Sequence, residues 1–236
     1  DNREIRVKYP KKKNLSIRKG LVLEIRVPEH CSLELEGVSC DIDVSDFHGQ
    51  LEAGAISGNI RVVGDTESID VSTVSGDVYV ESETDMVEIE SISGFVEVKG
   101  VRESLEISMV SGEAEVHCGE LQDFSFNCVS GDLDLTAEPA SGADWELECH
   151  SGDLTLHLPK DLSAEFDIEL FSGDVHNDFG PGARRTSKFA PGKELRFTAG
   201  EGEADIEVAG TEVMHTVRLR ADGDKCTCPW FSKYQG

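Results

Sequence analysis

The chain has 236 residues, of which 38% are hydrophobic and only 6% aromatic, and its 47 Asp and Glu against 22 Lys and Arg give a formal net charge of −25. This charge excludes nucleic acid and anionic membrane surfaces as expected partners, because both require clustered Lys and Arg. The sequence also lacks an apolar run of about 18 residues, so it contains no predicted transmembrane segment, and no basic-then-apolar leader marks a signal peptide.

Residues 1–37 are expected to lead into a repeat array and to cap its first edge. Residues 4–9 are strand-like, and this region is expected to contain the entry strands. The exposed edge at the end of such an array has to be covered, and Tyr9-Pro10 followed by three lysines is the candidate cap. Because the chain begins at Asp1 directly before strand-like sequence, we expect that an upstream segment, with any targeting signal, has been removed.

A Ser-Gly motif recurs through residues 38–178 and sets the period of the chain. The copies run from Val38-Ser39-Cys40-Asp41 to Phe171-Ser172-Gly173-Asp174. The motif serines are Ser39, Ser57, Ser75, Ser93, Ser111, Ser130, Ser151 and Ser172, at steps of 18 residues four times and then 19, 21 and 21. A fixed period near 20 is typical of solenoids, in which each unit buries its apolar face against its neighbours.

Period-two alternation within each unit predicts two strands per coil. One strand follows the motif, with inward residues such as Ile60 and Val62, and the other precedes the next motif, with inward residues such as Ile69 and Val71. Stacking at the strand spacing of about 4.8 Å places equivalent residues in columns. The glycine column is expected to form a bend that needs positive φ or close backbone approach, and the serine column a small-residue corner. Cys40 replaces glycine in the first copy.

The pattern changes after residue 178. Residues 179–194 are expected to form a loop excursion, and residues 195–236 closing strands with a C-terminal cap and tail. The closing strands are predicted at 195–197, 204–208 and 216–219, and the candidate cap residues are Trp230, Phe231 and Tyr234. The sequence therefore predicts a single solenoid domain over 1–236. It is expected to be all-β, a single-stranded parallel β-helix-like solenoid with about 18–21 residues and two main strands per coil.

The recurring Val-Ser-Gly-Asp-Val motif resembles the toastrack, or adhesin-like, family, a group of bacterial β-strand-repeat domains of unknown function. The resemblance covers nearly the whole chain. It includes Leu23–Pro28 with Ser32–Leu35, Phe171–Val175 followed by Asn177–Gly180, and Leu195–Thr198 before Gly202–Ile206. It implies the solenoid fold and an association with the cell envelope, and it assigns no catalytic or binding residues. Cys40 and the tail at Cys226-Thr-Cys228-Pro229 depart from the family pattern.

Acidic residues recur at outward positions of both predicted strands. A solvated face tolerates them, because two carboxylates about 5 Å apart repel by only about 1 kcal/mol in bulk water. One hypothesis of a site concerns Asp132, Asp134 and Asp153, whose oxygens would gather Ca²⁺ from neighbouring coils. The other concerns the thiols of Cys226 and Cys228, although zinc sites usually have four ligands.

Two further groups of residues have plain structural interpretations. Cys128 and Cys149 fall in an inward column with Met109 and Leu170 and are predicted to be buried apolar thiols. The loop residues Arg184, Arg185, Lys188 and Lys193 are expected to form a solvated basic turn.

We therefore expect a non-enzymatic structural, adhesin-like or binding module of the bacterial cell envelope, periplasmic or at the cell surface, without a cofactor. Its long regular faces would meet an unidentified protein or glycan partner. The alternatives are a carbohydrate-active β-helix enzyme and an intracellular scaffold or envelope-stress-response protein. A groove lined by aromatics with converging acids would indicate the enzyme, and flat acidic ladders the module. Open sheet edges also predict self-association through the solenoid ends.

Overall fold

The computed structural model describes residues 23–28, 30–187, 192–211 and 215–221, and all regular elements in these ranges are β-strands. The two candidate caps, at residues 9–13 and at Trp230, Phe231 and Tyr234, lie outside the described residues. So do Cys226, Cys228 and Lys188. Within the described part, no helix has the length and apolar character needed to span a membrane.

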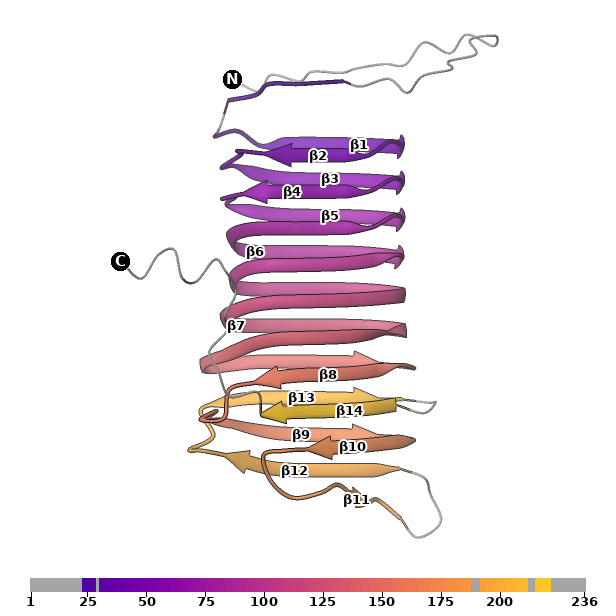
Figure 1. Cartoon of the computed structure of the whole chain (residues 1–236), viewed down its shortest axis with the longest axis vertical. Helices are drawn as coiled ribbons and strands as arrows, with labels where there is room; N and C mark the ends of the chain where they lie inside the picture. The colour runs from indigo at the N-terminus through magenta and orange to yellow at the C-terminus, as the bar shows by residue number, and fades with distance from the viewer. Residues whose placement is uncertain (1–22, 29, 188–191, 212–214, 222–236) are drawn as a thin grey trace.

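The strands stack into a flattened parallel coil (Figure 1). They are β1 (Leu33–Ser39), β2 (Ile42–Ser45), β3 (Gln50–Ser57), β4 (Ile60–Gly64), β5 (Ser68–Ser75), β6 (Val78–Ser93), β7 (Phe95–Cys149), β8 (Asp153–Leu158), β9 (Ala164–Leu170), β10 (Gly173–Asn177), β11 (Arg184–Arg185), β12 (Lys193–Ala199), β13 (Ala204–Gly210) and β14 (His215–Ala221). β6 and β7 are long because each passes around the coil without a break in strand geometry. The predicted β-helix-like solenoid is confirmed.

Each coil contributes one strand to each of two opposed faces. The face that contains β1, β3, β5 and β13 is called the β1 face, and the face that contains β2, β4, β8 and β14 is called the β2 face. Early coils are in register at a step of 18 residues, as shown by Leu51 opposite Ile69 on the β1 face and Ile60 opposite Val78 on the β2 face. Equivalent residues therefore form straight columns along the axis of the solenoid.

The core is the thin layer between the two faces. Its early coils contain mainly Val and Ile, whereas later coils contain Phe124, Phe126, Trp145 and Phe166, each no more than 2% exposed. Trp145 donates its indole N–H to the carbonyl of Leu121 at 3.3 Å and meets Phe124 edge-on. The later coils are also the longer ones, at 19 to 21 residues. We infer that the added residues widen the coil to hold aromatic side chains.

The Ser-Gly motif forms the corner at which the β1 face turns into the β2 face. Gly76 has a φ of 145°, and a Cβ there would lie 2.1 Å from the carbonyl oxygen of Gly58. The bend therefore requires glycine both for its positive φ and for the close approach of the backbone, as predicted. The serines do more than keep the corner small. The hydroxyl of Ser93 donates to the carbonyl of Val74 on the preceding coil at 3.1 Å, and Ser111 does the same to Ile92 at 3.2 Å.

The C-terminal strands do not simply continue the stack. β13 pairs in parallel with the 144–149 pass of β7 on one side and with β9 on the other, and β14 pairs with β8 and β10 in the same way. The last coil in the sequence is therefore inserted between two coils that precede it (Figure 1). This corrects the expectation that residues 204–219 close the end of the array.

The end of the array is covered by β12 instead. β12 runs antiparallel to β9, with Leu195 opposite Ile168 and Phe197 opposite Phe166, and the Phe166 and Phe197 rings stack at 4.7 Å. β11, within the expected loop excursion, adds a short antiparallel pair to β12. Of the three predicted closing strands, only the first one closes the stack.

Candidate functional site: a groove along the β1 face

The Asp or Asn residue that follows several of the Ser-Gly corners has a structural role on the β2 face. The side-chain oxygen of Asp41 accepts a hydrogen bond from the main-chain N–H of Asn59 at 2.9 Å. The side-chain oxygen of Asn59 in turn accepts one from the main-chain N–H of Asp77 at 3.0 Å. Asp77 then accepts the main-chain N–H of Phe95 at 3.0 Å. The recurrence of Asp and Asn at this position is therefore explained by coil-to-coil hydrogen bonds.

The proposed calcium ligands belong partly to this series. Asp132 accepts the N–H of Asp153 at 2.8 Å, and Asp153 accepts the N–H of Thr216 at 3.0 Å and lies 3.3 Å from the guanidinium of Arg218. Asp134 lies 3.4 Å from Nε2 of His157. Among the described residues, no group of three His, Cys, Asp or Glu side chains is arranged to hold a metal ion.

Titration with Ca²⁺ is expected to give no saturable heat and no shift in melting temperature at millimolar concentrations. The reason is that Asp132 and Asp153 already accept main-chain N–H groups and Asp153 faces a cation, whereas Ca²⁺ requires six to eight oxygen ligands. Isothermal titration calorimetry on the whole chain measures this. Saturable binding that Asp134→Asn abolishes would restore the calcium hypothesis.

The other candidate residues do not gather into one site. Cys128 and Cys149 are buried, as predicted, whereas Cys40 is exposed. Arg184 and Arg185 are exposed in β11, and Lys193 pairs with Asp174. That ion pair holds the pKa of the Asp174 carboxyl below its usual value, chiefly through a hydrogen bond from the Lys193 ammonium. The basic turn is therefore partly neutralised.

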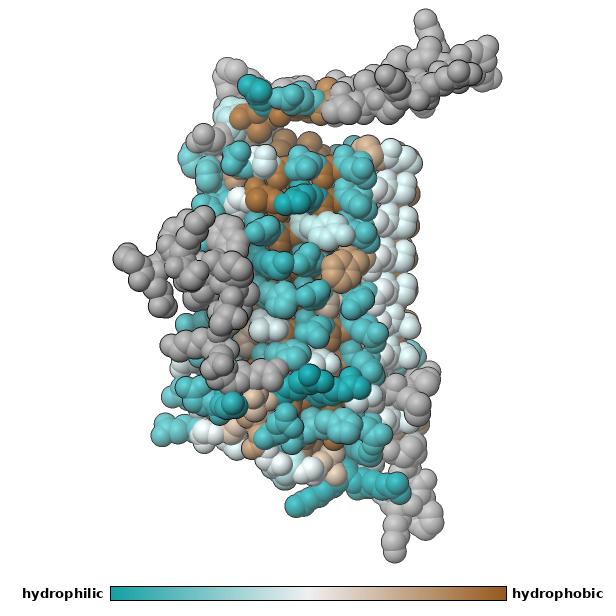
Figure 2. Space-filling model, viewed as in Figure 1, coloured by the Kyte–Doolittle hydropathy of each residue, from teal (hydrophilic) through white to brown (hydrophobic). Residues whose placement is uncertain are grey.

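A column of exposed aliphatic side chains runs along the β1 face just before the Ser-Gly corner. This aliphatic ridge consists of Val38, Ile56, Val74, Ile92, Val110 and Val129, which are between 42% and 68% exposed. Farther along the axis, Phe171 is 58% exposed. By contrast, the β2 face, which is toward the viewer in Figure 2, is largely hydrophilic. Large apolar side chains in a line are unusual on a soluble surface and are typical of interaction sites.

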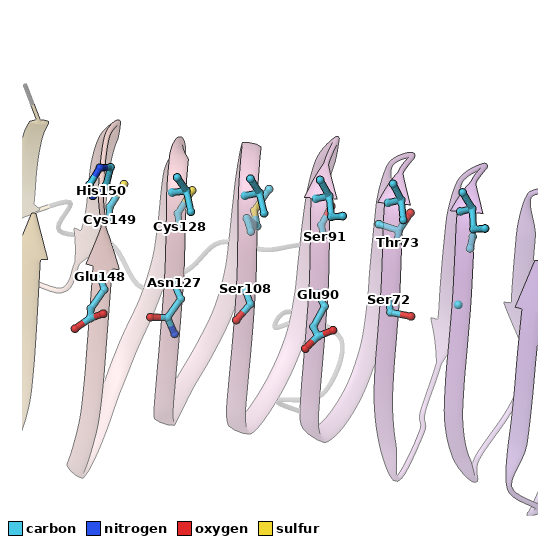
Figure 3. Close-up of a pocket in the computed structure, with 18 of the residues that line it drawn as sticks. Ser72, Thr73, Glu90, Ser91, Ser108, Asn127, Cys128, Glu148, Cys149 and His150 are labelled. Atoms are coloured by element: carbon cyan, nitrogen blue, oxygen red, sulfur yellow. The ribbon is translucent and has the colours of Figure 1, made fainter. Parts of the chain in front are cut away.

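A groove of about 860 Å³ follows the ridge along the axis. One wall is the ridge, and the other is a polar column that includes Ser72, Glu90, Ser108, Asn127 and Glu148 (Figure 3). The groove ends at His150, whose Nδ1 lies 2.8 Å from the hydroxyl of Thr211, just after the inserted strand β13. None of the described residues that line the groove is Phe, Tyr or Trp.

A ladder of carboxylates runs parallel to the groove on the same face. This acidic ladder consists of Glu34, Glu52, Asp70, Glu88 and Glu106, each directly opposite the next across neighbouring strands. Burial raises the pKa of Glu88, and the charges of Asp70, Glu106 and Glu90 raise it further. The carboxylates of the ladder therefore repel one another.

A second group of acidic residues lies near the far end of the solenoid, and an arginine neutralises part of it. Glu146, Glu207 and Asp167 form a second acidic run across β7, β13 and β9, and Arg196 of β12 lies opposite Asp167. Arg196 is 2.9 Å from Asp167 and 2.6 Å from Glu169. These two hydrogen bonds and the two charges raise the pKa of the Arg196 guanidinium. The inserted strand thus continues the acidic surface rather than interrupting it.

The aliphatic ridge was not predicted, although the sequence contains a signal for it. Period-two alternation that points Ile69 and Val71 inward also points Thr73 inward and Val74 outward. The period of the motif alone does not assign its aliphatic residue to a face. Counting from the inward pair would have placed the whole column on the surface.

The opposed faces, the stacked corners and the ladders define a solenoid repeat protein with a groove along one face. Residues 2–213 match the family described as Toastrack DUF4097, and the chain belongs to this toastrack family, whose function is unknown. No curated protein and no solved structure matches the chain. The family match establishes the class of domain, and the functional proposal rests on the surface of the β1 face.

Proposed function

We propose that this chain is a non-enzymatic binding module of the bacterial cell envelope, and that its groove docks a cationic amphipathic segment of a partner protein. The observation that carries the proposal is the exposed aliphatic ridge running parallel to the acidic ladder. An apolar stripe on the partner would cover the ridge, and Lys or Arg beside that stripe would face the ladder. Adhesion would be one use of such a surface.

The dimensions suit a helix laid along the axis. The ladder and the ridge occupy outward positions four residues apart on each strand, as in Glu34 and Val38, which corresponds to about 13 Å. A helix with its side chains is about 10–12 Å across, so it would contact both columns. Recognition of an amphipathic helix in a groove is a recurring mode of binding.

Charge supports a basic partner. The chain has a net charge of −25, and the ladder places carboxylates on neighbouring strands about 4.8 Å apart. A partner that brings positive charge relieves this repulsion and is steered toward the surface, with a rate that falls as salt is added.

The carbohydrate-active enzyme is the weaker alternative. Two of the outward aromatics, Tyr79 and Phe95, pair at 6.1 Å on the β2 face, away from the groove. Burial is the main cause that raises the pKa of the Tyr79 hydroxyl, followed by the charge of Asp77. An intracellular scaffold or stress-response protein is distinguished by location, which fractionation of cells that express the full-length precursor measures.

Binding of an 18-residue synthetic helix of Leu, Ala and Lys to the whole chain tests the proposal by calorimetry. Replacing Ile56 and Ile92 by Ser is expected to weaken binding by roughly 30-fold, because two half-exposed aliphatic side chains contribute about 2 kcal/mol when covered. Replacing Glu52 and Glu88 by Gln is expected to weaken binding of the helix about 5-fold and to reduce the dependence of the affinity on salt.

The matched control removes the same charge from the other face. Asp43→Asn with Asp134→Asn takes two carboxylates from the β2 face and is expected to change the affinity by less than about 2-fold, because charges across the molecule are screened at physiological salt. Equal weakening by the control and ladder variants, with no effect of the ridge variant, would mean non-specific attraction to an acidic protein. Binding of an envelope glycan but not of the helix would also refute a protein partner.

A further inference from the structure

Two buried thiols lie on neighbouring coils at the end of the groove. Cys128 is 7% exposed and Cys149 is 1% exposed, and both are free. The main-chain N–H of His150 donates to the carbonyl of Cys128 at 2.9 Å, which places Cys149 directly beside Cys128 in the parallel sheet. Figure 3 shows the two residues on adjacent coils.

The spacing of the coils suits a covalent link. Directly opposed residues on neighbouring strands lie about 4.8 Å apart, which is within the range of roughly 4.4–6.8 Å between the Cα atoms of disulfide-bonded cysteines. The surroundings leave room for the sulfur atoms: Gly210 of β13 lies opposite Cys149, and the Sγ of Cys128 occupies the space that a Cβ on Gly131 would need, at 3.0 Å.

The two neighbouring thiols also shift each other's ionisation. Their side-chain interaction lowers the pKa of Cys149 and raises the pKa of Cys128, which burial raises further. Cys149 is therefore the thiol of the pair that ionises first. Thiolates are the reactive form in thiol–disulfide exchange.

We propose that Cys128 and Cys149 form a coil-to-coil disulfide when the chain folds in the presence of a small-molecule disulfide. The Cys149 thiolate attacks one sulfur of that disulfide, which forms a mixed disulfide and releases one thiolate. The Cys128 thiol then loses its proton and attacks the Cys149 sulfur, which forms the internal bond and releases the second thiol. Two protein thiols are oxidised, and one small disulfide is reduced to two thiols.

The bond would tie together the two coils at the His150 end of the groove. Cys128 precedes Val129 of the aliphatic ridge, and Cys149 precedes His150, so both corners that line this end would be held at a fixed spacing. Oxidation would thereby make the groove more rigid. This assigns an oxidative modification site to a specific pair among seven cysteines.

The test is refolding of the fully reduced whole chain in a buffer of reduced and oxidised glutathione, followed by alkylation of free thiols and mapping of disulfides by mass spectrometry. The expected result is a Cys128–Cys149 bond in most molecules and a melting temperature roughly 5–10 °C above that of the chain refolded in reductant. Cys118→Ser, which changes a buried cysteine on the β2 face, should retain both results.

The two cysteine variants sharpen the result. Cys128→Ser and Cys149→Ser should each abolish the bond and the rise in melting temperature. If a variant folds poorly, the disulfide map of the chain without substitutions still tests the proposal. Recovery of Cys128 and Cys149 as alkylated free thiols in the oxidised sample would overturn the proposal. Bonding of either residue to a different cysteine would overturn it as well.

Discussion

Replacing Ile206 by Asp is expected to destabilise the C-terminal coils by more than about 4 kcal/mol. Ile206 is 1% exposed in the inserted strand β13, where it lies opposite Trp145 on one side and Phe166 on the other. A carboxylate there would be buried among aromatic rings without a partner, which is among the most costly single substitutions. Chemical denaturation measures the loss of free energy of unfolding.

The same variant tests the insertion itself. Because β13 separates the 144–149 pass of β7 from β9, hydrogen exchange should accelerate in both of these strands. Glu207→Gln, which alters the next and outward-facing residue of β13, should leave exchange unchanged. Acceleration confined to β9 and β12, with protection retained at 144–149, would indicate that β13 lies at the end of the stack.

Replacing Gly94 by Ala is expected to lower the free energy of unfolding by about 3–5 kcal/mol. The Cβ would lie 2.2 Å from the carbonyl oxygen of Gly76, and the φ of 135° disfavours any residue with a side chain. The neighbouring oxygen belongs to main chain that is fixed in the stack, so it cannot move away cheaply. Thermal and chemical unfolding both measure the loss.

Gly142 offers a matched control for the glycine prediction. It also has a positive φ, of 77°, but a Cβ there would have no atom within 4 Å. Gly142→Ala should therefore cost only about 1 kcal/mol, from backbone strain alone. Similar losses at Gly94 and Gly142 would show that the corner column is not held by close stacking of the coils.

The repeat made most of the fold predictable. A Ser-Gly corner at a fixed period, flanked by alternating apolar residues, is a local pattern, and Gly76 and Ile69 occupy the positions that it predicts. The insertion of β13 and β14 was not predictable in this way. The residues of β13 alternate like those of any other strand, so period and polarity predict a strand without specifying its neighbours.

The candidate site, like the fold, was predictable only in part. Carboxylates such as Asp77 were visible, but their role depends on a main-chain N–H one coil away, which no local pattern reveals. The outward direction of Val74 followed from alternation alone, and it could have been inferred. The repeat placed Cys128 and Cys149 in one inward column, whereas their direct opposition is shown by the hydrogen bond from the N–H of His150 to the carbonyl of Cys128, which a local pattern does not reveal.

A hydrogen-exchange footprint of the bound Leu-Ala-Lys helix on the whole chain shows directly where the helix docks. We expect slower exchange along the corners of the aliphatic ridge, from Val38 to Val129, and no change on the β2 face. Protection of the β2 face, or weak protection spread evenly over the solenoid, would contradict a docking groove on the β1 face.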